Sequence, residues 1–196
     1  MPFPLLPAVI VTVKGALFGQ VNENVWAVQW TGATPTDGEL HTILDIFQTG
    51  YANIMAPLSN QYSINEITGQ YIGVADGPEA TLVISPPQTG GAAAASSPGN
   101  VALCVSLRSG LSGRSKRGRK FFSGIPEAAT ADNAIDSGLC DLVVAAVVGM
   151  IAELEANGTP LGVVSKTIPA ITTILTALCV DTFVDSQRRR LTGRGR

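Results

Sequence analysis

Residues 36–57 read TDGELHTILDIFQTGYANIMAP, and this stretch carries the strongest secondary-structure signal in the chain. Thr36 followed three residues later by Glu39 is the capping-box pattern that starts a helix. Pro57 then marks the end of the pattern. We therefore predict a helix over residues 37–56 that buries one face in the core. Its apolar side chains recur at intervals of three and four, the helical period: Leu40, Ile43, Leu44, Phe47, Tyr51, Ile54 and Met55.

Segments with strand character surround this helix. Residues 8–19 and 25–31 predict a hairpin with a polar loop at 21–24. Its alternating Trp26, Val28 and Trp30 form an apolar face that we expect to pack on a helix. A second helix is predicted at roughly 130–156, and its apolar middle predicts burial on most sides. Further strands are predicted at 62–73, 80–85, 101–107, 160–166 and 171–184.

Together these elements predict an α+β fold, an antiparallel sheet of about seven or eight strands with two long helices packed on one face. A jelly roll with helical insertions is the alternative, because the number of candidate strands permits it. The length of 196 residues suits one domain. We divide the chain into an extended apolar arm (1–7), a single α+β domain (8–187) and a basic C-terminal tail (188–196). Within the domain, 86–100 is a low-complexity loop and 108–120 is a basic loop.

Basic residues are concentrated in two clusters, which hold 11 of the 13 Lys and Arg residues. Neither cluster contains an acid, so its charges repel one another unless an anion lies among them. We keep two candidate anions, the phosphates of a nucleic acid and the carboxylates of a neighbouring protein. If the strand ends before the two clusters lie at one edge of the sheet, the clusters merge into one positive surface. The cluster residues are Arg108, Arg114, Lys116, Arg117, Arg119, Lys120, Arg188, Arg189, Arg190, Arg194 and Arg196.

Charge is otherwise scarce. Charged residues make up 14% of the chain, against about 25% in an average soluble domain. Because a monomer needs charged surface to stay in solution, we expect much of the surface to meet other protein. We also expect the apolar arm at 1–7 to lie on a neighbouring subunit. Residues 1–107 contain one base and seven acids, whereas 108–196 contain twelve bases and eight acids, so the chain is bipolar.

The sequence contains no pattern typical of catalysis, a metal site or a cofactor site. His41 is the only histidine, so acid–base chemistry lacks its usual agent. We expect Cys104, Cys140 and Cys179, which are far apart, to be small buried side chains in two strands and a helix. The glycine-rich stretch at 110–116 lacks the GxxxxGK[ST] spacing of a phosphate loop. We therefore predict a protein that is not an enzyme and binds no cofactor, metal or small-molecule substrate.

Four segments of the C-terminal half resemble putative coat proteins of small-genome viruses known mostly from environmental sequencing. They are VSLRSG (105–110), GRSKRGR (113–119), GIPE (124–127) and DSQRRRLTGRG (185–195). The resemblance implies a capsid protein, a subunit that assembles with copies of itself into a shell around a viral genome. The N-terminus departs from many small-virus coats, because their N-terminal arms are strongly basic and this one is apolar.

The sequence therefore leaves two candidate functions. The first is a coat protein of the virion, whose basic clusters contact nucleic acid without sequence preference or contact neighbouring subunits. The second is a nucleic-acid-binding accessory protein that forms no shell. Residues 1–7 lack the basic start of a secretory signal, and the apolar run at 142–152 is too short to span a bilayer. We accordingly expect synthesis inside the host cell and no membrane partner.

Overall fold

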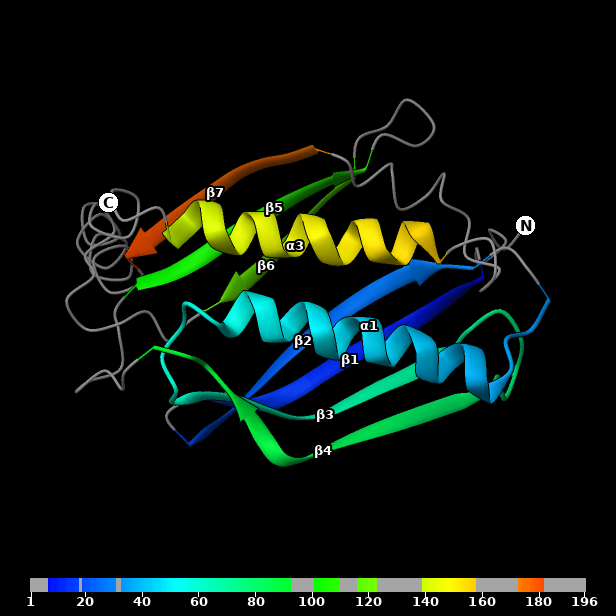
Figure 1. Cartoon of the computed structure of the whole chain (residues 1–196). Helices are drawn as coiled ribbons and strands as arrows, with labels where there is room; N and C mark the ends of the chain where they lie inside the picture. Colours follow the sequence, from blue (N-terminus) through cyan, green and yellow to red (C-terminus); the bar gives the residue numbers. More distant parts are fainter. Residues whose placement is uncertain are drawn as a thin grey trace, which may run out of the picture.

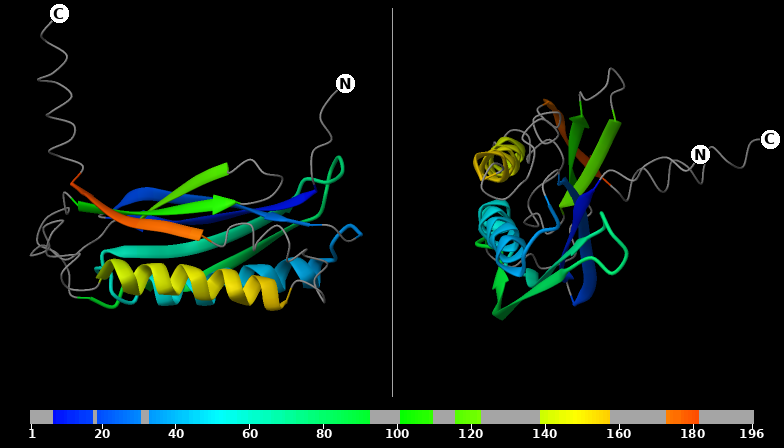
Figure 2. Two further views of the ribbon diagram at one scale, coloured as in Figure 1. Left: turned by 90° about the horizontal axis from the view of Figure 1, so that it is seen from above. Right: turned by 90° about the vertical axis from the view of Figure 1, so that its right-hand side faces the viewer.

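The computed structural model describes residues 7–17, 19–30, 33–92, 101–109, 116–122, 139–157 and 173–181. One antiparallel sheet has the strand order β2-β1-β3-β4, and a second has the order β6-β5-β7. Helices α1 and α3 lie beside each other and run in opposite directions (Figure 1). Both helices cover the same side of the two sheets (Figure 2). The elements are β1 (Ala8–Leu17), β2 (Gln20–Gln29), α1 (Asp37–Met55), β3 (Tyr62–Tyr71), β4 (Glu79–Thr89), β5 (Val101–Ser109), β6 (Lys116–Phe122), α3 (Leu139–Ala156) and β7 (Thr173–Asp181).

The predicted single sheet of seven or eight strands is wrong, and so is the jelly-roll alternative. In the part of the chain that the structure describes, four strands form one sheet and three form another. The physical reason is that alternation of apolar residues marks a strand but does not identify its hydrogen-bonding partner. The predicted strand at 160–166 lies outside the described residues.

The first hairpin is tighter than predicted. Leu17 pairs with Gln20, so only two residues join β1 to β2, and Gly19 has a φ of 75° that suits glycine at this turn. The predicted polar loop at 21–24 is part of β2 instead. Its Asn24 is buried and pairs with Val13 of β1. Polar residues therefore extend the strand rather than interrupt it.

Helix α1 begins as its sequence predicts. The Oγ1 of Thr36 accepts a hydrogen bond from the Glu39 backbone N–H at 3.3 Å, and the Thr36 N–H donates to Glu39 Oε2 at 2.7 Å. This reciprocal pair satisfies the backbone N–H groups of Thr36 and Glu39 at the exposed start of the helix. The predicted helix over 37–56 is confirmed, with its last helical residue at Met55.

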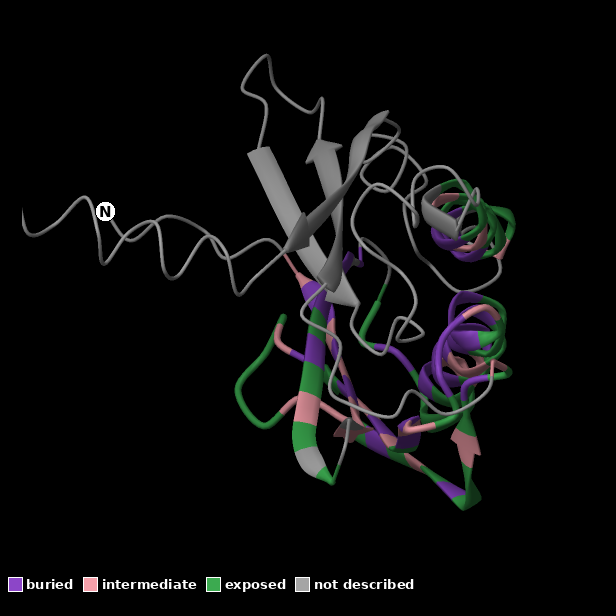
Figure 3. Ribbon diagram, turned by 90° about the vertical axis from the view of Figure 1, so that its left-hand side faces the viewer, coloured by how far each residue is buried: buried purple, intermediate pink, exposed green. Residues whose placement is uncertain are grey.

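Helix α1 packs on the face of the first sheet that carries Trp26, and the ribbon in Figure 3 colours the buried residues of this layer purple. The Trp26 indole N–H donates to the Tyr51 hydroxyl at 2.8 Å, and the Trp26 ring meets Phe47 edge to face at 5.7 Å between centroids. Gly69 of β3 admits Leu44 closely, since a Cβ added there would lie 3.0 Å from Leu44 Cδ2. The predicted packing of the Trp26 face on a helix is confirmed.

Helix α3 is buried on one side rather than on most sides. Its buried side chains join the same core as α1, but Leu142 is 59% exposed and Val148 is 47% exposed. The sequence prediction fails here because an apolar residue on a helix can also face outward. Neither helix of the described residues is long and apolar enough to cross a membrane. The part of the predicted helix before Leu139 lies outside the described residues.

The same arrangement of elements occurs twice along the chain. β1 and β2 form a hairpin, α1 follows, and β3 then pairs antiparallel with β1. In the second unit β5 and β6 form a hairpin, α3 follows, and β7 pairs antiparallel with β5. The resulting strand orders, β2-β1-β3 and β6-β5-β7, correspond position by position. The fold therefore consists of two hairpin–helix–strand units whose helices contact each other.

Candidate nucleic-acid interface

The first basic cluster is built into the second sheet. Arg108 lies near the end of β5, and Lys116, Arg117, Arg119 and Lys120 lie in β6. The sequence prediction of a basic loop over 108–120 is therefore corrected at both ends, because these residues extend one strand and form another. The remaining cluster positions lie outside the described residues: Arg114, Arg188, Arg189, Arg190, Arg194 and Arg196.

The register of β5 and β6 brings like charges together. Arg108 pairs directly with Arg117, and Ser106 pairs with Arg119. Residues directly opposite, and residues two positions apart on one strand, share a face of the sheet. The backbone therefore places Arg108, Arg117 and Arg119 on one face, at the end of the hairpin. Like charges at directly opposed positions weaken a strand pair unless an anion compensates them.

The third strand adds hydroxyl-bearing residues to the same face. Thr173 of β7 pairs with Arg108, and Thr176 pairs with Ser106. Hydroxyls and guanidinium groups are both common partners of phosphate oxygens. Sequence reasoning missed Ser106, Thr173 and Thr176 as members of the site. The alternation along β5 is a signal for Ser106, but the two threonines become its neighbours only through long-range pairing.

The two strands that precede the basic clusters in the sequence, β5 and β7, finish at opposite ends of the second sheet. β5 and β7 are antiparallel, so Val101 pairs with Asp181 at one end and Arg108 pairs with Thr173 at the other. Asp181 is the last described residue before the basic tail. Along β7 it lies about eight residues, or about 27 Å, from Thr173 at the hairpin end. The sequence predicted one merged positive surface only if the strand ends before the two clusters were neighbours. The ends of β5 and β7 are not neighbours, so this condition is not met.

Lys14, the only base among residues 1–107, forms an ion pair within the first sheet. Lys14 Nζ lies 2.7 Å from Glu66 Oε1, on the face of the first sheet away from Trp26. The hydrogen bond to Glu66 raises the pKa of Lys14, and the charges of Glu66 and Glu23 act in the same direction. Lys14 is therefore compensated by carboxylates, whereas Arg108 and Arg117 occupy directly opposed positions of β5 and β6.

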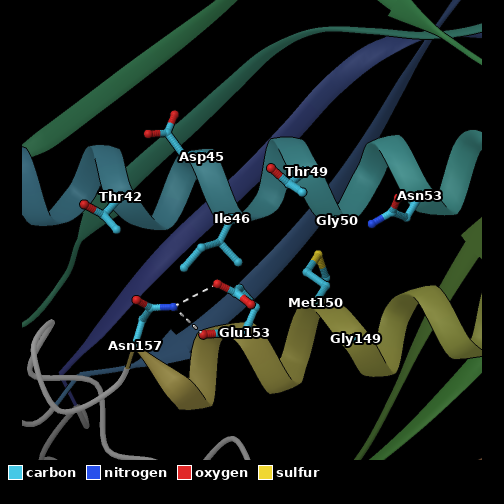
Figure 4. A pocket seen from close by; sticks show the side chains of 10 residues that line it. All are labelled: Thr42, Asp45, Ile46, Thr49, Gly50, Asn53, Gly149, Met150, Glu153 and Asn157. Carbon is cyan, nitrogen blue, oxygen red and sulfur yellow. Dashed lines mark hydrogen bonds between the residues drawn. The ribbon is translucent and has the colours of Figure 1, made fainter.

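A groove of about 380 Å³ lies between the two helices (Figure 4). Asp45 from α1 and Glu153 from α3 line it, and the Asn157 amide donates to the Glu153 side chain at 3.2 Å and to its carbonyl at 2.9 Å. His41 is exposed on α1 and does not line this groove. Among the described residues no group of three or more His, Cys, Asp or Glu side chains is placed to hold a metal ion. The groove is thus acidic, and a phosphate would be repelled from it.

Comparisons with known proteins assign no family to this chain. No protein-family model matches it, and no match was found among curated proteins or among solved structures.

Proposed function

We propose that this protein is a self-assembling coat protein whose β5–β6 hairpin contacts the packaged nucleic acid. The observation that carries the proposal is the directly opposed pair Arg108 and Arg117, with Arg119 on the same face. Such an arrangement is favourable when phosphates lie among the charges, and contacts of this kind carry no sequence preference. The hydroxyl residues Ser106 and Thr173 extend the same face.

Self-assembly rests on two further sequence features. Charged residues make up 14% of the chain, which leaves much surface suited to contact with other copies. The resemblance of the C-terminal half to viral coat proteins points in the same direction. On this proposal the protein acts in the virion and is not an enzyme, and its partners are its own copies and the genome.

The test replaces the three arginines of one face together, Arg108→Gln, Arg117→Gln and Arg119→Gln. A control lowers the net charge equally on exposed positions of α1, with Thr49→Glu, Ala52→Glu and Asn53→Glu. Particles of both variants are purified, treated with nuclease and assayed for protected nucleic acid. We expect the arginine variant to form shells that hold several-fold less nucleic acid, and the control to package a normal amount.

Two outcomes would overturn this role of the hairpin. If the folded arginine variant forms no shells, its arginines join subunits, as carboxylate partners of a neighbouring copy would require. If its shells contain the normal amount of nucleic acid, the hairpin does not contact the genome. Binding of nucleic acid without any shells, in the unsubstituted protein, would instead support the accessory-protein alternative.

A further inference from the structure

The two helices contain acids and no bases, whereas the strands contain both, since Glu23, Glu66 and Glu79 lie with Lys14 on the face of the first sheet away from α1. The segments of α1 and α3 contain no Lys or Arg. Of their acids, Asp37, Asp45, Asp141 and Glu153 are exposed. Every base in the described residues lies in a strand instead: Lys14, Arg108, Lys116, Arg117, Arg119 and Lys120.

The two helices lie together on one side of both sheets (Figure 2). In the first sheet, the face away from α1 is identified by its exposed residues, among them Thr81 of β4, which pairs with Thr68. Thr49 lies on the exposed side of α1. These two threonines therefore mark the sheet side and the helix side of the molecule.

The central strand β5 indicates how the second sheet is oriented. Its alternate positions are Val101, Leu103, Val105 and Leu107 on one face, and Ala102, Cys104, Ser106 and Arg108 on the other. A sheet covered by a helix on one side directs its more apolar face toward that helix, and α3 contacts this sheet through β7. The face that carries Arg108, Arg117 and Arg119 is then the one directed away from the helices. Lys116 and Lys120, which pair with Ser109 and Val105, lie on the opposite face.

We infer that the protein is oriented in its shell with the sheet side toward the nucleic acid and the helix side outward. This inference rests on the proposed function and adds a direction to it. Phosphates are attracted to the arginine face of the second sheet. They are repelled by the helix layer, where Asp45 and Glu153 line the groove and no base lies in either helix segment.

The first experiment measures which side of the protein is accessible in intact shells. Thr49→Cys and Thr81→Cys are each treated with a polyethylene glycol maleimide too large to enter a shell, and the unsubstituted chain gives the background from its own cysteines. We expect Thr49→Cys to be labelled in intact shells and Thr81→Cys only after dissociation. Equal labelling of both in intact shells, or labelling of Thr81→Cys alone, would overturn the orientation.

A second experiment tests which side of the protein attracts nucleic acid, and it needs no shells, so its result is independent of the proposed coat function. Thr81→Arg and Thr49→Arg each add one charge at an exposed position, on the sheet side and the helix side respectively. Binding of a long single-stranded oligonucleotide is measured at several salt concentrations. We expect Thr81→Arg to tighten binding and steepen the salt dependence by about 0.7 in log–log slope, and Thr49→Arg to change it less. An equal or larger effect of Thr49→Arg would contradict the inference.

Discussion

Tyr62 shows how a single buried polar group is accommodated in the first sheet. It is 1% exposed, and burial raises its pKa to about 12, while hydrogen bonds with Asn24 and Asn22 act in the opposite direction. Burial likewise raises the pKa of Tyr51, which accepts the Trp26 hydrogen bond. Both hydroxyls are therefore protonated at neutral pH and act as structural hydrogen-bonding groups, not as nucleophiles.

The raised pKa of Tyr62 predicts that the protein loses stability in alkaline solution. Its folded pKa lies above the ordinary value of 10.0, so the unfolded chain releases the proton first. The contribution of Tyr62 to stability is complete below pH 10 and is lost as the pH rises toward 12. Between pH 10 and pH 12 the free energy of unfolding in urea should fall in both proteins. We expect the fall to be smaller in Tyr62→Phe than in the unsubstituted protein, by up to about 2 kcal/mol. Parallel pH profiles for the two proteins would refute this role.

The helices and strands that the sequence predicts correctly are those with strong local signals, such as a helix cap or a regular apolar period. Helix α1 has both a capping box and a regular apolar period, and its predicted bounds agree with Asp37–Met55. Strands β1, β3, β5 and β7 lie within a few residues of the ranges that the sequence predicts for them. Existence of these elements therefore follows from residues that are close together in the chain.

Strand β6 illustrates what the sequence could not provide. Residues 116–122 contain four bases and a glycine, a composition that has low strand propensity. They form a strand because they pair with β5, and the opposed position of Arg108 and Arg117 exists only through that pairing. The candidate site was therefore predicted as a set of charges, but its arrangement on one face of a sheet was not.

The contact between α1 and α3 predicts opposite effects of two glycine substitutions. A Cβ on Gly50 would overlap the side chain of Met150, whereas a Cβ on Gly149 would meet nothing within 4 Å. We expect Gly50→Ala to destabilise the fold by about 1–3 kcal/mol through overpacking, and Gly149→Ala to stabilise it by about 0.5–1 kcal/mol through helix propensity. Thermal and urea unfolding would measure both. A neutral or stabilising Gly50→Ala would mean that the two helices are not in close contact at this point.

The whole molecule combines two similar structural units of unequal charge. The first unit contains the acidic part of the chain, and its only base, Lys14, is paired with Glu66. The second unit contains the hairpin with Arg108, Arg117 and Arg119. A molecule of this kind can present one face to a polyanion and use other surfaces, poor in charge, for contacts with its own copies. Both properties are required of a coat subunit.

The most direct test of the proposed function is electron microscopy of the purified full-length chain after nuclease treatment, with the absorbance ratio at 260 and 280 nm measured on the same particles. A coat protein of the proposed kind gives closed shells of uniform diameter that contain nuclease-protected nucleic acid. A chain that remains monomeric or forms only small oligomers at low and physiological salt, with or without added nucleic acid, would contradict the proposal.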